Sequence, residues 1–427
     1  MNNELVLDVH EKPKSKIAWL FMSLQHVFAM FGATVLVPIL TGLPVGVTLV
    51  ASGIGTLTYI AFTKAKAPVF LGSSFAFIPA IIANTHIVDG VADYSAAYFG
   101  LMTVGIVYVV VGFIIQFVGS DWLRKLLPPV VIGPMIIIIG LVLAPVAISN
   151  AGLLASVEGV EFDYFTPLVA AFTFSVVVLV SIYGKGLLKI IPFLVAIVAG
   201  YLLAIPLGLV DFESFSNASF FIIPNFKIVG TYSANFSAVL VFAPIAFVTI
   251  AEHIGNHTVL GEVIGKDLIK DPGLDKTLFG DGVATFISAA IGGPANTTYG
   301  ENTGVVAMTK VASVWVTGLA AIFAITLGFL GYVQSFILSI PGGVIGGITI
   351  VLYGLIAGNG VKVLVKERVN FSNMKNLVIA GAMLVVGLGG ATIAVNANTE
   401  LTGMSLAALI GVLLNLILNP SKDDIIE

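Results

Sequence analysis

The chain consists mainly of long apolar stretches separated by short polar connections. A helix that crosses the hydrocarbon core of a bilayer needs about 20 mostly apolar residues, and on that measure the sequence predicts fourteen membrane segments. The predicted segments are residues 17–40, 45–62, 68–84, 95–118, 126–148, 166–183, 188–207, 236–257, 277–292, 294–309, 311–330, 334–357, 373–390 and 402–419. The predicted fold class is an all-α polytopic membrane protein.

The third and tenth predicted segments are interrupted by polar and helix-breaking residues. In the tenth, residues 294–304 read PANTTYGENTG and carry a carboxylate, amides and hydroxyls together with proline and glycine. Irregular backbone at that depth is tolerated only where it is buried in protein or lines a watery cavity, and an ionisable residue there indicates function. We predict that each broken segment is a short strand followed by a half-helix, and that the two segments form a substrate site in mid-membrane.

Charged residues sort between the connections in the way expected when both chain ends are cytoplasmic. Cytoplasmic loops gather Lys and Arg, and alternate connections do so, beginning with Lys12, Lys14 and Lys16; Lys227 is the exception. The connections between them carry the acidic residues Asp89, Asp93, Glu158, Glu161, Asp163, Asp211 and Glu213. The pattern predicts a protein of the bacterial cytoplasmic membrane with cytoplasmic tails, residues 1–16 and 421–427.

Short matching motifs indicate an internal repeat. Residues 128–133 (PPVVIG) resemble residues 341–346 (PGGVIG), and residues 68–77 in the third segment match residues 294–303 in the tenth. With seven segments in each half, the second half must enter the membrane from the opposite face. The predicted architecture is therefore a 7+7 inverted repeat, as in many secondary transporters.

Composition narrows the class of protein further. Of the 427 residues, 58% are hydrophobic and 10% charged, against about 45–50% and 25% in soluble proteins. Cysteine is absent and no HExxH, GxSxG or Walker motif occurs, so we expect no enzyme, no metal site and no cofactor other than a coupling proton. The net charge of −4 and the lack of a basic tract argue against a nucleic-acid partner and leave membrane lipid as the expected surroundings.

Two glutamates in the predicted membrane segments are the strongest candidates for substrate contact. Glu301 stands in the broken tenth segment, and Glu252 in the eighth shares a helix face with Asn256, four residues later. Carboxylates beside the free backbone amides of half-helices make an alternating donor and acceptor surface. Such a surface suits a planar, neutral solute with C=O and N–H groups, such as a pyrimidine or purine base. Because a buried carboxyl readily takes up a proton, the pattern also favours proton symport.

Other residues of the predicted membrane segments are weaker candidates for substrate contact. The aromatic residues that offer apolar faces to a flat ring are Phe75, Tyr299 and Tyr353. For His26, a hydrogen bond between helices is favoured over substrate contact. His253 is expected to pack against other helices, since it points about 100° away from Glu252. Asp281 is expected near a cytoplasmic helix end, without a ligand.

Several runs resemble the nucleobase–ascorbate transporter (nucleobase–cation symporter-2) family, most closely its bacterial uracil permeases. They are SLQHVFAMFGAT (23–34), LGSSFAF (71–77), AEHIG (251–255), KDL (266–268), DPGL (271–274) and NTTYGEN (296–302). The resemblance implies a core domain of residues 17–118 and 236–330 and a gate domain of residues 119–235 and 331–420. It also implies homodimers that form through the gate domain.

The resemblance assigns roles to individual residues as well. In that family the carboxylates matching Glu252 and Glu301 bind the base together with backbone amides. The full set of residues that we expect around the substrate is Glu252, Glu301, Phe75, Gly300, Tyr299, Ala33 and Tyr353. The residues expected to support proton coupling are Glu252, Asn256, His26 and Asn302.

One position departs from the pattern of the family. Uracil permeases usually place a His one turn after the glutamate of segment eight, whereas this chain has Asn256, followed by His257. Asn256 can hydrogen-bond Glu252 but cannot titrate. The departure affects the expected proton path and leaves the expected base site intact.

The resulting hypothesis is proton-coupled uptake of uracil by alternating access, in which the core domain moves against the gate domain. A xanthine or uric acid permease of the same family stays open as an alternative, because the residues alone do not separate one ring from two. An anion transporter of the same fold is less favoured, since the sequence places no Lys or Arg in mid-membrane.

Overall fold

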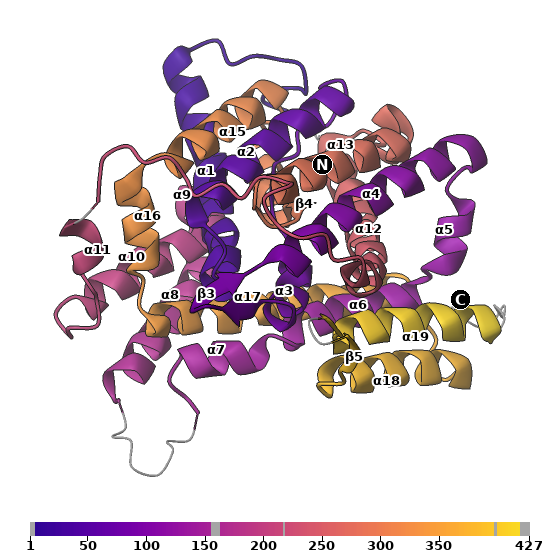
Figure 1. The fold of residues 1–427 in the computed structure, drawn as a ribbon. Coiled ribbons are helices and arrows are strands. Elements are labelled where there is room, and N and C mark those ends of the chain that lie inside the picture. Colours follow the sequence, from indigo (N-terminus) through magenta and orange to yellow (C-terminus); the bar gives the residue numbers. More distant parts are fainter. Residues whose placement is uncertain (1–4, 155–162, 217, 397–398, 419–427) are drawn as a thin grey trace.

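The computed structural model describes residues 5–154, 163–216, 218–396 and 399–418. The predicted C-terminal tail, the first four residues of the predicted N-terminal tail, and Glu158 and Glu161 lie outside the described residues. Within the described part the chain is mostly helical, as predicted (Figure 1).

The elements of the first half of the chain run from the N-terminus to the long connection before residue 237. They are α1 (Lys16–Thr41), α2 (Val45–Phe62), β1 (Leu71–Ser73), the 3-10 helix η1 (Phe75–Phe77), α3 (Ile78–Ala83), β2 (His86–Val88), β3 (Val91–Asp93), α4 (Ser95–Val118), α5 (Asp121–Leu126), α6 (Pro129–Leu141), α7 (Ala144–Asn150), α8 (Phe165–Tyr183), α9 (Leu187–Ile190), α10 (Pro192–Ala204) and α11 (Glu213–Ser216).

The elements of the second half complete the fold. They are α12 (Ser237–Ile264), the π-helical turn η2 (Ile269–Gly273), α13 (Leu274–Ala290), β4 (Asn296–Thr298), α14 (Gly300–Thr309), α15 (Val314–Gly328), α16 (Gly331–Leu338), α17 (Gly342–Lys366), α18 (Met374–Leu388), β5 (Ile393–Asn396), β6 (Thr399–Leu401) and α19 (Gly403–Ile417). The strands pair antiparallel as β1 with β4, β2 with β3 and β5 with β6.

Of the twelve predicted segments without a break, nine coincide with one helix and three do not. Segment five is divided into α6 and α7, and segment seven into α9 and α10. Segment twelve was misplaced: a separate helix α16 precedes Pro341, and α17 continues to Lys366. The reason is local, because a residue that precedes proline is disfavoured in helical conformation, so the chain breaks at Ile340 and a new helix starts after Pro341.

Seven helical stretches among the described residues are long and apolar enough to cross a membrane. They are α1, α2, α4, α6 with α7, α8, α12 and α17. Four shorter apolar helices, α10, α15, α18 and α19, add to these. The broken segments β1–α3 and β4–α14 were predicted correctly as a short strand followed by a short helix. The count of fourteen segments and the inverted repeat stay predictions.

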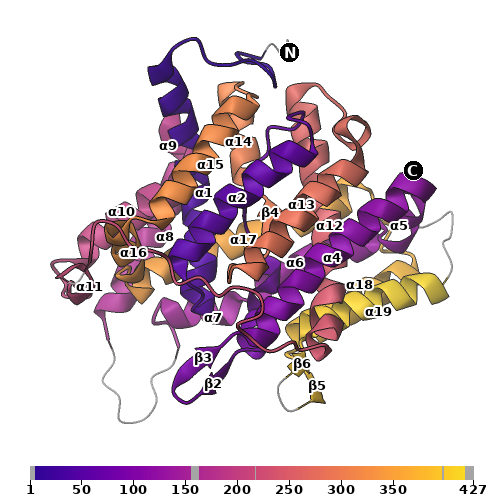
Figure 2. The ribbon, with the colours of Figure 1, turned by 45° about the horizontal axis from the view of Figure 1, so that its top comes forward.

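The long helices pack in two groups. In one group, α13 lies between α4 and α2, α2 also contacts α15, and α12 packs on α4. In the other, α17 contacts α6 and α8, α10 packs on α8, and α18 pairs with α19. Figures 1 and 2 show α18 and α19 side by side next to α6, and α2 beside α15 on the other side of the molecule. The groups meet where α12 contacts α19 and α6 and where α1 contacts α10.

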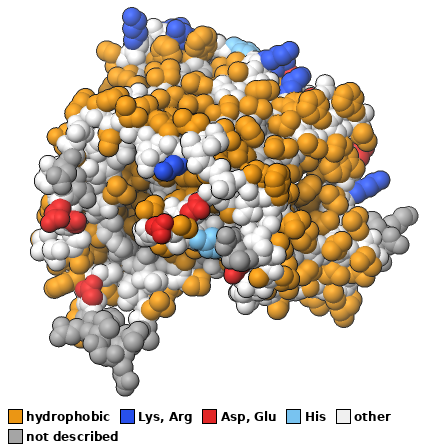
Figure 3. Space-filling model, in the orientation of Figure 1, with side chains coloured by type: hydrophobic (Ala, Val, Ile, Leu, Met, Phe, Trp, Pro, Cys, Tyr) orange, Lys and Arg blue, Asp and Glu red, His pale blue; other side chains and the backbone are white. Residues whose placement is uncertain are grey.

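The outer surface is apolar. Large hydrophobic side chains on the outside of α4 and α8 are exposed, including Phe117, Val118 and Ile182, at 81%, 71% and 63% of their area. In Figure 3, hydrophobic atoms cover most of the visible face, while Lys and Arg gather mainly along its upper and right edges. A surface of this kind fits a lipid environment.

The chain before α1 is part of the folded structure from residue 5 onward. Its backbone pairs with the connection between α14 and α15: the Val6 amide donates to the Lys310 carbonyl at 2.8 Å, and the Ala312 amide donates to the Leu7 carbonyl at 2.9 Å. Lys266, after the end of α12, forms an ion pair with Asp8 at 2.7 Å. The segment therefore connects α12 with the start of α15.

Some helices approach each other closely because a glycine, which has no side chain, lies at their contact. A Cβ atom built on Gly105 of α4 would lie 2.6 Å from the Gly282 carbonyl oxygen and 2.7 Å from the Phe286 nitrogen of α13. Small residues allow this kind of backbone approach between membrane helices. The α4–α13 contact thus depends on glycine at this position.

We expect Gly105→Ala to destabilise the protein by about 1–3 kcal/mol, the usual cost of overpacking. Gly381→Ala is the matched control, because this glycine lies inside α18 with open space around its missing Cβ. Thermal unfolding of both purified variants in one detergent measures the difference. A melting temperature of the Gly105 variant equal to that of the control would contradict the close contact.

Candidate functional site

Two short strands pair in the interior of the protein. β1 and β4 run antiparallel, with Leu71 opposite Thr298 and Ser73 opposite Asn296, and every residue of both strands is buried. Two further backbone bonds extend the ladder, and Ser52 of α2 donates a hydrogen bond to the Leu71 carbonyl at 2.9 Å. The backbone groups that an interrupted membrane segment exposes are in this way satisfied inside the protein.

A helix begins directly after each strand. η1 starts at Phe75 and continues into α3, and α14 starts at Gly300. The first amides of a helix lack acceptors within it, and the cap residues Ser74 and Tyr299 make no side-chain hydrogen bond to them. The strand pair therefore places two helix starts, each with free N–H donors and partial positive charge, on opposite sides of one small region.

Glu301 and Glu252 stand at this region. Glu301 lies in the first turn of α14, and Glu252 lies on α12, which packs against α14. Both side chains are partly buried. Within the described ranges, no hydrogen bond or ion pair joins either carboxylate to another residue. Their oxygens are thus available to accept hydrogen bonds from a ligand.

Two aromatic residues from different helix groups meet beside the helix start of η1. The Phe75 ring contacts the ring of Tyr353 on α17 edge to face, with centroids 6.4 Å apart and an interplanar angle of 76°. Both are buried, and the Tyr353 hydroxyl has no hydrogen-bond partner. Buried hydroxyls are normally paired, so this one is a candidate for contact with a ligand.

Tyr299 has a positioning role in the strand pair. Its hydroxyl donates to the Ser73 carbonyl at 2.9 Å and accepts from the Thr34 hydroxyl of α1 at 3.3 Å. Its ring lies over Gly72, where a Cβ atom would come within 2.3 Å. Ala33, the neighbour of Thr34, is buried in the same part of α1. The hydroxyl of Tyr299 is therefore occupied within the protein.

His26 and Asn302 hold α14 against α1. The Asn302 amide nitrogen lies 3.1 Å from His26 Nδ1 and donates to the His26 backbone carbonyl at 3.1 Å. Both side chains are buried, and the Asn302 side-chain oxygen has no partner. The expectation of a helix-to-helix hydrogen bond for His26 agrees with this contact.

Asn256 binds the strand pair, and its expected hydrogen bond to Glu252 is absent. Its side-chain nitrogen donates to the backbone carbonyl of Thr298 at 2.9 Å and to the Thr298 hydroxyl at 3.0 Å. Asn256 thus joins α12 to β4 and donates no hydrogen bond to Glu252.

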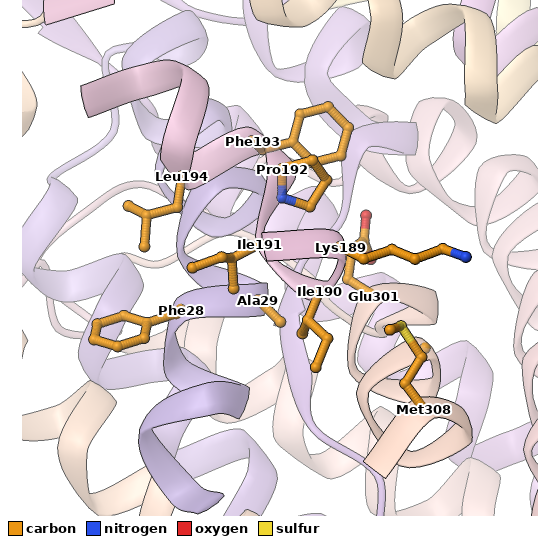
Figure 4. Close-up of a pocket in the computed structure, with 11 residues that line it drawn as sticks. Phe28, Ala29, Lys189, Ile190, Ile191, Pro192, Phe193, Leu194, Glu301 and Met308 are labelled. Carbon is orange, nitrogen blue, oxygen red and sulfur yellow. The ribbon is translucent and has the colours of Figure 1, made fainter. Parts of the chain in front are cut away.

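A cavity of about 190 Å³ opens next to Glu301. It lies between α1, α14 and the α9–α10 segment, and Figure 4 shows Glu301 and Lys189 at one end with Phe28 and Leu194 at the other. Apolar side chains form most of the remaining wall. Of the residues expected around the substrate, Glu301 lines this cavity.

The expectations for Asp281 and His253 were wrong. Asp281 is completely buried in the middle of α13, and its carboxylate lies 2.8 Å from His253 Nδ1. Neither a helix end nor simple packing describes this pair. The signal available in the sequence was that an Asp within an apolar helix needs a partner, but the partner comes from another helix and cannot be identified from spacing.

Comparisons with known proteins identify the family and the fold. A family model described as a permease family matches residues 17–395. The chain belongs to this family. The resemblance to nucleobase–ascorbate transporters that the motifs indicated is thereby confirmed, and the permease is a multi-pass membrane transporter.

Curated relatives match over nearly the whole length of this permease. A uracil permease of Bacillus caldolyticus is 46% identical over 419 residues, which cover 97% of this chain and 95% of the relative. A uracil permease of Bacillus subtilis is 43% identical over 424 residues, covering 98% and 96%. A uracil permease of Escherichia coli is 42% identical over 398 residues, covering 93% and 90%.

Solved structures resemble this permease in fold. The transmembrane domain of the cyanobacterial bicarbonate transporter BicA has a TM-score of 0.62 at 14% identity and covers 95% of this chain and 99% of that one. The murine anion transporter Slc26a9 in the inward-facing state has a TM-score of 0.69 at 12% identity, covering 96% and 69%. At these identities the likeness concerns the fold alone.

We expect the contact between His26 and Asn302 to appear as an energetic coupling. His26→Phe and Asn302→Ala each leave the other buried polar group without its partner, so the two losses should not add. The coupling expected for a buried hydrogen bond is about 0.5–1.5 kcal/mol. Thermal unfolding of both single variants and the double variant measures it, and strictly additive losses would show that the two side chains do not interact.

Proposed function

We propose that this permease takes up uracil together with protons. One observation carries the proposal: two carboxylates, to which no other described residue donates a hydrogen bond, stand beside two helix starts whose cap residues make no side-chain hydrogen bond. Uracil presents two C=O and two N–H groups around one flat ring. The carboxylates of Glu252 and Glu301 are suited to accept its N–H hydrogens, and the amides at Phe75 and Gly300 to donate to its carbonyls.

The surrounding side chains suit a flat, neutral ring. Phe75 and Tyr353 offer apolar surface, Ala33 leaves room at α1, and Tyr299 keeps the strand pair in place. A permanently anionic substrate is disfavoured next to two carboxylates. This argument separates the proposal from anion transport on the same fold.

The choice of uracil over a larger base rests on the relatives. The curated relatives named above are uracil permeases of 42–46% identity over nearly the full chain. A xanthine or uric acid permease is the alternative within the family. Competition separates the two, since a tenfold excess of unlabelled uracil should suppress uptake of labelled uracil while the same excess of xanthine leaves it unchanged.

Proton coupling is supported by the pairing of the two glutamates. Two like charges in a poorly hydrated interior are costly, and one added proton relieves both their repulsion and their desolvation. If the base donates its N–H hydrogens to one ionised and one protonated carboxyl, its binding would fix the protonation state of the two glutamates. We therefore assign the coupling role to Glu252, with Asn256, His26 and Asn302 as supporting residues and no cofactor besides the proton.

Alternating access is supported by contacts at the two ends of the site. At one end Asn84, at the end of α3, forms two hydrogen bonds with the backbone of Glu400 in β6, at 3.3 and 3.1 Å. The Ser405 hydroxyl of α19 donates to the Val241 carbonyl of α12 at 2.8 Å. At the other end lies the cavity beside Glu301. We assign the first end to the outside and the cavity to the cytoplasm, so that residues 17–118 and 236–330 move as a core domain against a gate domain.

The cellular setting follows from the same reasoning. We assign the permease to the bacterial cytoplasmic membrane with both termini cytoplasmic, because Lys and Arg lie in alternate connections that include the tails. A homodimer through the gate domain is the expected assembly in the lipid.

The central test is the substitution of each glutamate by glutamine. Glu301→Gln should reduce uptake of labelled uracil by proteoliposomes to background, since it removes a charged hydrogen bond of about 1.5–3 kcal/mol. Glu252→Gln should weaken uracil binding and proton-driven uptake together. Glu262→Gln is the control: this carboxylate is on the same helix, exposed, and paired with Lys366, so uptake should be unchanged.

Normal uptake by the Glu301 variant would remove its assigned role. Equal amounts of protein in the proteoliposomes and equal melting temperatures show that a loss of uptake is not a loss of folding.

Tyr353→Phe tests the buried hydroxyl. Because this hydroxyl has no partner among the described residues, its removal should leave the melting temperature of the uracil-free protein unchanged or raise it. If the hydroxyl binds the base, uracil affinity should fall about two- to twelvefold, the equivalent of one neutral hydrogen bond. Calorimetry on the purified variant gives the affinity, and an unchanged value would exclude Tyr353 from the polar contacts of the base.

A further inference from the structure

A second group of buried polar side chains lies on another face of α12, away from the cavity. Its members come from four helices and are each at most 2% exposed: Tyr59 of α2, Tyr108 of α4, His253 and His257 of α12, and Asp281 of α13. The proposed base site uses none of them. The five side chains are called the histidine cluster below.

The histidine cluster is continuous. Asp281 Oδ2 lies 2.8 Å from His253 Nδ1. The rings of His253 and His257 stack, with centroids 4.0 Å apart and an interplanar angle of 28°. His257 Nε2 hydrogen-bonds the Tyr59 hydroxyl. The Tyr108 ring completes the enclosure, edge-on to His253 at 6.2 Å.

The hydrogen bonds fix where a further proton can bind. His257 Nδ1 lies 2.7 Å from the His253 backbone carbonyl, which can only accept, so Nδ1 carries a hydrogen. In neutral His257 the other nitrogen, Nε2, is then an acceptor, and the Tyr59 hydroxyl donates to it. Since a hydroxyl can turn and accept instead, Nε2 can take up a proton without a change in the surrounding atoms.

The cluster also has unused hydrogen-bonding capacity. Among the described side chains, His253 Nε2, Asp281 Oδ1 and the Tyr108 hydroxyl are buried without a partner. No Lys or Arg forms an ion pair with Asp281. A buried carboxylate without a compensating charge is costly, so a proton held on the imidazoles or on Asp281 itself is the compensation that the site provides.

A metal ion does not explain the arrangement. The imidazole rings stack face to face and do not converge on one point. Within the described residues, no group of three His, Asp or Glu side chains is arranged to hold a metal ion.

The cluster is linked to the proposed base site through α12. Glu252 directly precedes His253 on this helix, so a single turn carries a carboxylate of the proposed base site and an imidazole of the cluster. The titratable groups that contact the two imidazoles are Asp281 from α13, Tyr108 from α4 and Tyr59 from α2, while Glu252 points to another side of α12.

We propose that the histidine cluster is a second proton-binding site, in which His257 takes up a proton when uracil binds beside Glu252. The inference rests on the proposed uptake of uracil. A proton on the cluster lowers the cost of an ionised carboxylate at the base site, and an ionised carboxylate there strengthens binding of the cluster proton, since linkage is reciprocal.

The test is the number of protons taken up per uracil bound by the purified, full-length protein. Calorimetry in buffers of different ionisation enthalpy measures it between about pH 5 and 8, the range in which a histidine switches. If the binding of one uracil is coupled to the uptake of one proton, the affinity for uracil changes up to about tenfold per pH unit. In His257→Gln, which keeps an acceptor for Tyr59, uracil should still bind, with proton uptake and pH dependence reduced by at least about half.

His10→Gln is the matched control, because this histidine is exposed and outside the membrane helices; its proton uptake should equal that of the unaltered protein. Proton uptake by the His257 variant equal to that of this control would overturn the inference and leave the proposed function standing. If the unaltered protein binds no uracil at any pH, the proposed function itself fails. Tyr59→Phe removes the hydroxyl that hydrogen-bonds His257 Nε2, so it should also shift the pH midpoint of uracil affinity. This second variant keeps the inference testable if the His257 variant does not fold.

Discussion

The antiparallel pairing of β1 with β4 is the constraint on which the rest of the structure depends. An interrupted membrane segment exposes backbone N–H and C=O groups that lipid cannot satisfy. Here two interrupted segments satisfy each other, with Leu71 opposite Thr298 and Ser73 opposite Asn296. The amides at the helix starts after each strand lie outside this pairing, and these are groups that a polar solute can use.

Side chains from the surrounding helices hold this pair in register. Ser52 binds it from α2, Asn256 from α12 and Thr34 from α1, the last through Tyr299. None of these three groups needs to touch a substrate to be important. The site is rigid because strands of three residues are fixed from three helices, and a rigid arrangement of donors and acceptors is what gives a small polar ligand a defined orientation.

The parts of this organisation that depend on local sequence could be predicted. Apolar length located the long helices, and the polar run at 294–304 identified the broken segment and Glu301. The start of α17 was misplaced because the apolar run passes through Pro341 without a change in composition. The residues that these side chains contact in the folded protein could not be predicted from the sequence. The spacing of four residues allows a hydrogen bond from Asn256 to Glu252, yet Asn256 donates to Thr298 of β4. Asp281 of α13 contacts His253 of α12.

One turn of α12 explains why these contacts belong together. Glu252 faces the region of the helix starts, His253 meets Asp281, Asn256 binds Thr298, and His257 binds Tyr59. Because consecutive helix positions point about 100° apart, a single turn presents a carboxylate to one side and imidazoles to another. A shift or rotation of this turn cannot alter one contact without altering the others. In the proposed mechanism, the backbone of this one helix would therefore couple the exchange of a proton on one face to the exchange of a solute on the other.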